Sequence, residues 1–188
     1  MASAVSVCNR ALQKLGADRI TSLTEDTPVA RECNACYEPL LEAELRAHPW
    51  NFAVKRAMLA ADSDAPPFGY SLQYTLPVDF LRLLHNEEYG ADLDYKIEGD
   101  KILCDLPSPL NIRYIARVND PNLFDALFAE AFATRMAFEM AEKITQSNAK
   151  GSQLREDYKQ AIREARKANA FERVSIEFPA SSWERARL

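Results

Sequence analysis

The chain has 188 residues, 47% of them hydrophobic and 27% charged, which is typical of a folded globular domain and excludes wholesale disorder, collagen and coiled coils. Its net charge is −5, with 14 Lys/Arg against 22 Asp/Glu in residues 1–149 and 9 against 6 in residues 150–188. A mostly acidic body repels phosphate backbones and argues against tight nucleic-acid binding. The basic excess at the C-terminus fits solvated helix faces, with an acidic protein partner as the alternative.

No stretch of the sequence suggests insertion into a membrane or export. The longest apolar runs fall short of the ~20 residues that cross a bilayer. The first residues lack the basic region and apolar stretch of a signal peptide. We therefore expect a protein that is made in a cytoplasm and has no membrane partner.

Two helices are predicted in the first part of the chain. Apolar residues recur at helical spacing over residues 3–15, and Gly16 provides the usual C-terminal stop. The second helix is predicted to begin at Thr27, as N-cap, and to end near His48-Pro49. Because Pro39 falls inside this helix, we expect a kink or a division into two pieces.

A short antiparallel β region is predicted for about residues 50–118. Apolar and polar residues alternate from Trp50 to Lys55 and from Tyr70 to Pro77, and a Pro-containing loop covers 62–69. Further strands are expected at 80–84, 95–98, 101–104 and 111–116, with Gly99-Asp100 as a hairpin turn. Large aromatics dominate core energetics, so we expect Trp50, Phe52, Tyr70 and Tyr74 to form the junction between helices and sheet.

Helices return at about 121–144 and again up to Phe171. The apolar stripe of the last helix is narrow, so much of this helix is solvated or awaits a partner. The expected fold class is α+β, mainly α: a helical bundle (1–49 and 119–172), an inserted short antiparallel β region (50–118) and an extended C-terminal tail (173–188). The tail carries several apolar side chains, so it either docks on a partner or frays.

No pattern in the sequence predicts catalysis, a cofactor or a metal. The two histidines, His48 and His85, lie outside any signature of a catalytic or zinc site, and we expect them to cap a helix, pack on Trp50 or end a strand. Cys33 and Cys36 form a lone CxxC without a second ligand pair, which favours core packing over a metal or redox role. We therefore expect a protein that is not an enzyme.

Several short motifs follow one another in a specific order along the chain. They are CNRALQKLGA at 8–17, RITSL at 19–23, YEP at 37–39, LRAHPWNFA at 45–53, FGY at 68–70, YTLPVD at 74–79 and KIT at 143–145. Together they resemble the phage head-to-tail adaptors, the family that includes the tail tubular protein A and tail accessory factor proteins. The resemblance covers nearly the whole chain, to about Phe171, and residues 173–188 match least well.

The resemblance implies a structural virion protein at the head-tail junction. Adaptors of this family form a ring of twelve between the portal protein and the next tail component, a nozzle or tail-tube protein. The ring extends the DNA channel and helps to retain packaged DNA, which passes through without sequence-specific binding. The C-terminal segment of the family reaches into grooves between portal subunits.

The expected portal-binding residues lie in that C-terminal segment. Interfaces draw on aromatic and arginine anchors, which favours Ile176, Phe178, Trp183, Arg185 and Leu188. A segment that orders only on contact would make assembly wait for the portal.

Two other function classes stay open. One is a cytoplasmic helical binding module or regulator, and the other is a virion-associated peptidoglycan hydrolase with two carboxylates converging on a cleft.

Overall fold

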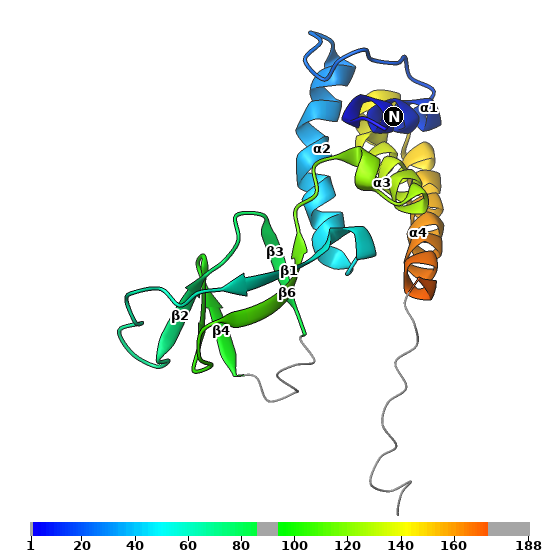
Figure 1. Cartoon of the computed structure of the whole chain (residues 1–188). Coiled ribbons are helices and arrows are strands. Elements are labelled where there is room, and N and C mark those ends of the chain that lie inside the picture. Colours follow the sequence, from blue (N-terminus) through cyan, green and yellow to red (C-terminus); the bar gives the residue numbers. More distant parts are fainter. Residues whose placement is uncertain (1, 86–93, 173–188) are drawn as a thin grey trace, which may run out of the picture.

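The computed structural model describes residues 2–85 and 94–172 (Figure 1). The fold is α+β and mainly α, as predicted, with helices on both sides of a β region along the chain. The helices are α1 (Ala4–Leu15), α2 (Pro28–Ala47), α3 (Ala126–Thr145) and α4 (Asn148–Phe171). The strands are β1 (Val54–Leu59), β2 (Leu72–Thr75), β3 (Phe80–Leu84), β4 (Tyr95–Glu98), β5 (Lys101–Cys104) and β6 (Leu110–Ala116). None of the helices in the described part of the chain is long and apolar enough to span a membrane.

The helix ends follow the capping residues of the sequence. The Ser3 side chain accepts a hydrogen bond from the backbone of Ser6, and Gly16 ends α1 in the left-handed region at φ 74°. The Thr27 side chain caps α2, as predicted. Of the two outcomes expected at Pro39, a kink or a division, the division does not occur, because α2 runs through Pro39 as one helix of 20 residues. Burial of its apolar face against the other helices offsets the loss of one backbone hydrogen bond.

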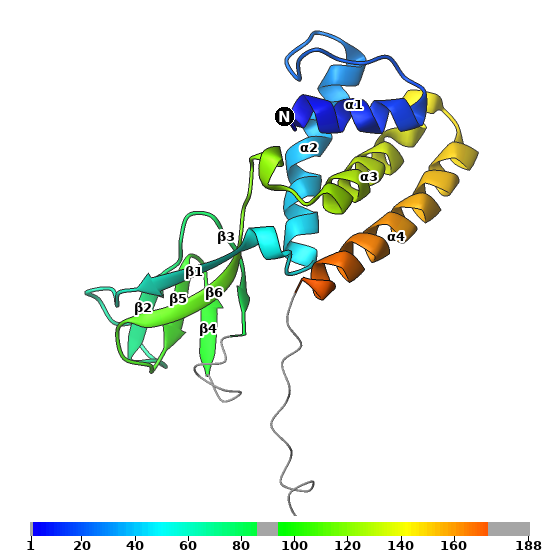
Figure 2. The same ribbon diagram turned by 45° about the vertical axis from the view of Figure 1, so that its right-hand side comes forward.

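The helical core is centred on α3, which contacts the other three helices (Figures 1 and 2). Phe128, Phe132, Met136 and Met140 of α3 are fully buried. Their neighbours include apolar residues of all the other helices. The core therefore joins segments from both ends of the sequence, with the β region inserted between α2 and α3.

The β region contains two small antiparallel sheets rather than one. Their strand orders are β1-β6-β3 and β2-β5-β4, and a bridge between Ala61 and Tyr74 joins them. A second core lies between the sheets and contains Tyr74, Ile102, Ile112 and Tyr114. The hairpin turn at Gly99, at φ 61°, is as predicted. The two sheets thus pack face to face around their own core.

The strand expected from Trp50 begins later. Residues Asn51–Ala53 form the short 3₁₀ helix η1, and β1 starts only at Val54. Trp50 is fully buried in the helical core, where its ring lies 4.8 Å from that of Phe128. The alternation at 50–53 therefore reflects burial against α3 and not a sheet face.

The expected aromatic junction is wrong for two of its four residues. Trp50 and Phe52 pack in the helical core, but Tyr74 lies in the core between the sheets, and Tyr70 is half-buried and hydrogen-bonded to Asp94. In place of the two tyrosines, Leu81, Ile115 and Val118 enter the helical core from β3, β6 and the segment after β6.

Candidate partner-binding surface

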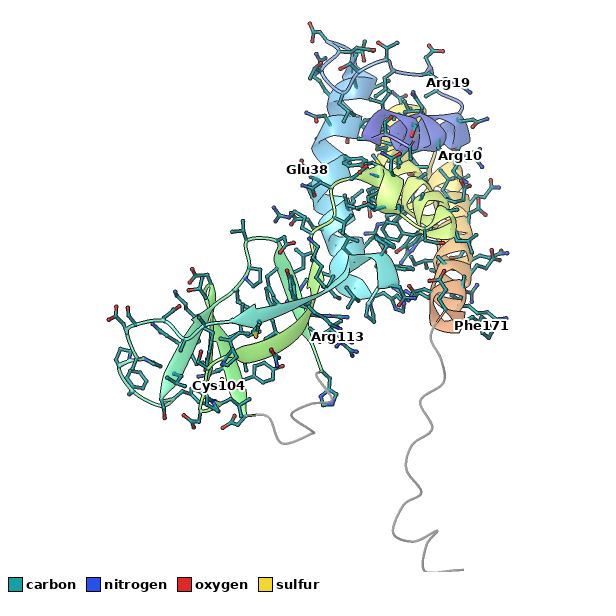
Figure 3. The ribbon with its side chains drawn as sticks, in the orientation of Figure 1. Arg10, Arg19, Glu38, Cys104, Arg113 and Phe171 are labelled. Atoms are coloured by element: carbon teal, nitrogen blue, oxygen red, sulfur yellow. The ribbon has the colours of Figure 1, made fainter. Side chains whose placement is uncertain are left out.

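The predicted portal-binding residues Ile176, Phe178, Trp183, Arg185 and Leu188 lie outside the described residues. The described chain ends just after α4, at Glu172, so the structure places the point from which residues 173–188 continue. Phe171, in the last turn of α4, is 78% exposed, and the Lys167 ammonium lies 5.9 Å from the centre of its ring (Figure 3). An exposed aromatic side chain therefore stands at the start of the proposed docking segment.

A hydrogen-bonded clamp holds the end of α4 against residues 48–51. The Asn169 side chain is buried and accepts a hydrogen bond from the backbone N–H of Asn51 at 2.8 Å. Its Nδ2 lies 3.1 Å from Nε2 of His48 and donates to the Pro49 carbonyl at 3.2 Å. In return, Nδ2 of Asn51 donates to the Asn169 carbonyl and to Oε2 of Glu172, both at 2.9 Å. The clamp therefore fixes the last turn of α4 against the segment that follows α2.

The segment that receives α4 is itself fixed by Trp50. Its ring contacts that of His48 edge-on at 4.6 Å, which confirms the predicted packing of His48 on the indole. The indole Nε1 donates to the Glu44 carbonyl at 3.0 Å, so the buried N–H is satisfied. The reversal after α2 is therefore a rigid base for the clamp.

A buried carboxylate ties α4 to α2 further along the helix. Glu44 is 5% exposed, and its Oε1 accepts a hydrogen bond from the hydroxyl of Tyr158. Burial and this hydrogen bond raise the pKa of Tyr158 to about 12. The Arg135 guanidinium of α3 lies 5.2 Å from the Tyr158 ring centre. Three helices thus meet at one polar contact inside the bundle, which adds to the rigidity of α4.

A second exposed aromatic surface lies at the far end of the β region. Phe68 is 87% exposed in the loop before β2. Beside it is a shallow hollow of about 210 Å³ between that loop and the sheet, lined by Pro67, Lys96 and Lys101 among others. Pockets for small molecules are larger and more enclosed, so this surface is better suited to a protein contact.

The cysteines lie in the cores. Cys33 is fully buried, as predicted, with its Sγ 3.8 Å from Sδ of Met140, and Cys8 and Cys104 are fully buried too. Burial raises the pKa of the Cys36 and Cys104 thiols, and a hydrogen bond with Cys33 raises that of Cys8. Residues 2–85 and 94–172 contain no group of three His, Cys, Asp or Glu side chains placed to hold a metal. His85 directly follows β3 and is exposed, which confirms the predicted strand end.

The N-terminal motif residues make structural contacts. The Asn9 side chain exchanges two hydrogen bonds of 2.8 Å with the backbone of Ile20. Glu130 of α3 binds Arg10 through two contacts of 2.9 Å and Lys14 at 2.6 Å. The hydrogen bond from Arg10, together with Lys14, lowers the pKa of Glu130 to about 2. These residues hold the first loop and α1 onto the bundle.

Sequence reasoning missed the buried polar residues Asn169 and Glu44. Asn169 follows Ala165 by one helical turn on the buried face of α4, and Glu44 directly precedes the buried Leu45. A polar residue on an apolar stripe is a signal that predicts such contacts, although it does not name the partner. Comparisons with known proteins identify no relative: no protein family matches the sequence, and no characterised protein matches it either.

Proposed function

We propose that this chain is a structural subunit of a phage virion, a head-to-tail adaptor. Twelve copies would form a ring between the portal and the next tail component, which extends the DNA channel and helps to retain packaged DNA. The observation that carries the proposal is the clamp around Asn169, which holds the end of α4, directly before residues 173–188, on the helical bundle. Such an anchor suits a segment that inserts into a neighbouring protein.

The arrangement of the two cores supports a connecting role. The β region and the end of α4 lie on either side of the C-terminal end of α2 (Figure 2). Each has an exposed aromatic side chain, Phe68 in the loop before β2 and Phe171 in the last turn of α4. A subunit with two separate contact surfaces can join two different components.

The motifs that resemble adaptor proteins also support the proposal through their place in the fold. The 8–17 and 19–23 motifs meet at the Asn9–Ile20 hydrogen bonds, and the 45–53 motif forms the base of the clamp. These motifs therefore specify the bundle and the exit of its C-terminal segment, which are the features that an adaptor needs.

Native mass spectrometry tests the proposal directly. The purified chain is measured alone and mixed with the portal protein encoded beside it. We expect a portal-bound ring with the copy number of the portal. A chain truncated after Glu172 keeps its melting temperature and loses portal binding, and so does a chain with residues 173–188 replaced by a Gly/Ser segment of equal length.

Three results would contradict the proposal or part of it. Absence of any complex at low and high salt, with stable dimers of the chain alone, indicates a binding module without a portal. Portal binding by the truncated chain refutes the role of the C-terminal segment. Lytic activity on purified peptidoglycan indicates the hydrolase instead.

A further inference from the structure

Three arginines lie together on the outer face of the sheet β1-β6-β3. Arg56 of β1 is the direct cross-strand partner of Arg113 of β6, and Arg82 of β3 pairs with Ile115, two residues further along β6. Side chains alternate between the two faces of a strand. Because Ala57, Ile112 and Tyr114 face the core between the sheets, Arg56 and Arg113 must face outward. We call Arg56, Arg82 and Arg113 the arginine face.

The arginine face has no counter-charge in the described part of the chain. The ion pairs found there join other arginines to carboxylates, as for Arg10 with Glu130 and Arg117 with Glu42, but none involves the arginine face. The Nε atoms of Arg82 and Arg113 are buried and have no hydrogen-bond partner there. Like charges directly opposite each other destabilise a sheet. Within the described part of the chain these arginines therefore lie together without a counter-charge, which suggests that the face is completed by another molecule.

The surroundings of the arginine face resemble a protein interface. Met58 lies on the same face two residues after Arg56 and is 70% exposed. Arginine and methionine are enriched in interface cores, whereas lysine is depleted. On the adjoining end of α2, Arg46 donates to the Leu81 carbonyl, which places a fourth guanidinium beside β3. Figure 3 shows Arg113 on the side of the β region that is turned toward the end of α4.

We propose that the arginine face binds carboxylates on a second copy of this chain. This inference rests on the proposed ring, for which it names the contact between neighbours. Residues 1–149 hold 22 Asp/Glu against 14 Lys/Arg, so a second copy offers an excess of carboxylates to three arginines that have no ion pair among the described residues. Glu38, for example, is exposed on α2 without an ion pair among the described residues, and it lies on another side of the molecule from Arg113 (Figure 3). Contacts between two different surfaces close into rings.

The charge reversal Arg56→Glu separates this role from a structural one. In the isolated subunit it replaces the Arg56–Arg113 repulsion by an attraction, so the melting temperature should rise by about 1–3 °C. In the assembly it places a carboxylate against carboxylates, so the affinity between copies should fall at least tenfold. Arg155→Glu, at an exposed position on α4, makes the same charge change and should leave the affinity unchanged.

Sedimentation velocity over a concentration series, with and without the portal and at low and high salt, measures this affinity. Three results together support the inference. Arg56→Glu associates more weakly than the wild type, Arg155→Glu associates normally, and the wild type associates more weakly at high salt. In a second experiment, Arg56→Lys places an amine on the same face. A carbodiimide should then link residue 56 to an Asp or Glu of another copy, as mapped by mass spectrometry.

Three results would overturn the inference. The first is assembly of Arg56→Glu like the wild type, which leaves the adaptor proposal intact. The second is a wild-type chain that does not self-associate either alone or on the portal. The third is a wild type that binds a 30-base-pair DNA duplex and an Arg56→Glu variant that loses this binding but still self-associates. That result assigns the arginine face to nucleic acid. Failure to bind the portal, with self-association through the arginine face retained, refutes the adaptor proposal alone.

Discussion

Replacing Asn169 by alanine should release the end of α4 from the bundle. The substitution removes three side-chain hydrogen bonds: one from the Asn51 backbone and those to His48 and Pro49. Each net hydrogen bond of this kind contributes about 1 kcal/mol, and a buried group left without a partner costs more. Alanine regains about 0.6 kcal/mol through its higher helix propensity. The expected loss in the free energy of unfolding is therefore about 2–3 kcal/mol.

Two measurements check this magnitude. For a chain of this size each kcal/mol shifts the melting temperature by about 2–4 °C, so Asn169→Ala should melt about 4–12 °C lower. Hydrogen exchange should show faster exchange of the Asn51 amide and of the last turn of α4. Asn34→Ala is the matched control, because Asn34 is exposed on α2 and makes no side-chain hydrogen bond among the described residues. It should raise the stability by about 0.6 kcal/mol, because it gains the same helix propensity and loses no side-chain hydrogen bond.

Equal melting temperatures for Asn169→Ala and Asn34→Ala would refute the reasoning. The same holds for unchanged protection of the Asn51 amide. Asn169→Asp provides an intermediate test, because it keeps the acceptor for the Asn51 N–H and loses the donor to Pro49. It should be destabilised as well, although it retains one of the three hydrogen bonds.

Three further substitutions test separate elements. Glu130→Gln should lower stability at pH 7 by about 0.5–1 kcal/mol after solvent screening; because the Glu130 pKa is lowered to about 2, the difference from wild type should shrink as the pH falls below about 5 and disappear near pH ~1. Pro39→Ala should raise stability by about 1–3 kcal/mol, since it restores a backbone donor inside α2 at an exposed position. Gly99→Ala should cost about 1 kcal/mol through the positive φ alone, because no other atom lies within 4 Å of the added Cβ.

Thermal melts over a pH series and at pH 7 check all three. A Glu130→Gln deficit that stays undiminished from pH 7 to about pH 2 would contradict the assigned ion pairs with Arg10 and Lys14. A lower melting temperature for Pro39→Ala would show that the proline ring contributes packing. Gly151→Ala in α4 is the control for Gly99→Ala, because its Cβ meets Ala141 at an ordinary 3.7 Å and should stabilise the helix.

The helices and hairpins could be predicted because their signals are local. Ser3, Gly16 and Thr27 act within one helical turn, and the Gly99 turn joins adjacent strands. The error at residues 50–53 has a tertiary cause. Trp50 occupies a site in the helical core beside Phe128, which lies far along the chain, and burial of the indole overrides the alternation.

The sequence by itself determined the order of elements, the helix caps, the turns and the apolar residues that form the two cores. These depend on backbone geometry and on periods of a few residues. Only the tertiary structure decided that two sheets pack against each other and that Arg56 faces Arg113. It also decided that Asn169 meets His48 and Asn51, which lie more than a hundred positions earlier in the sequence. Strand register and helix packing set those pairs, and both result from burying the whole apolar surface at once. The clamp and the arginine face, on which the proposed function and its extension depend, both belong to that second group.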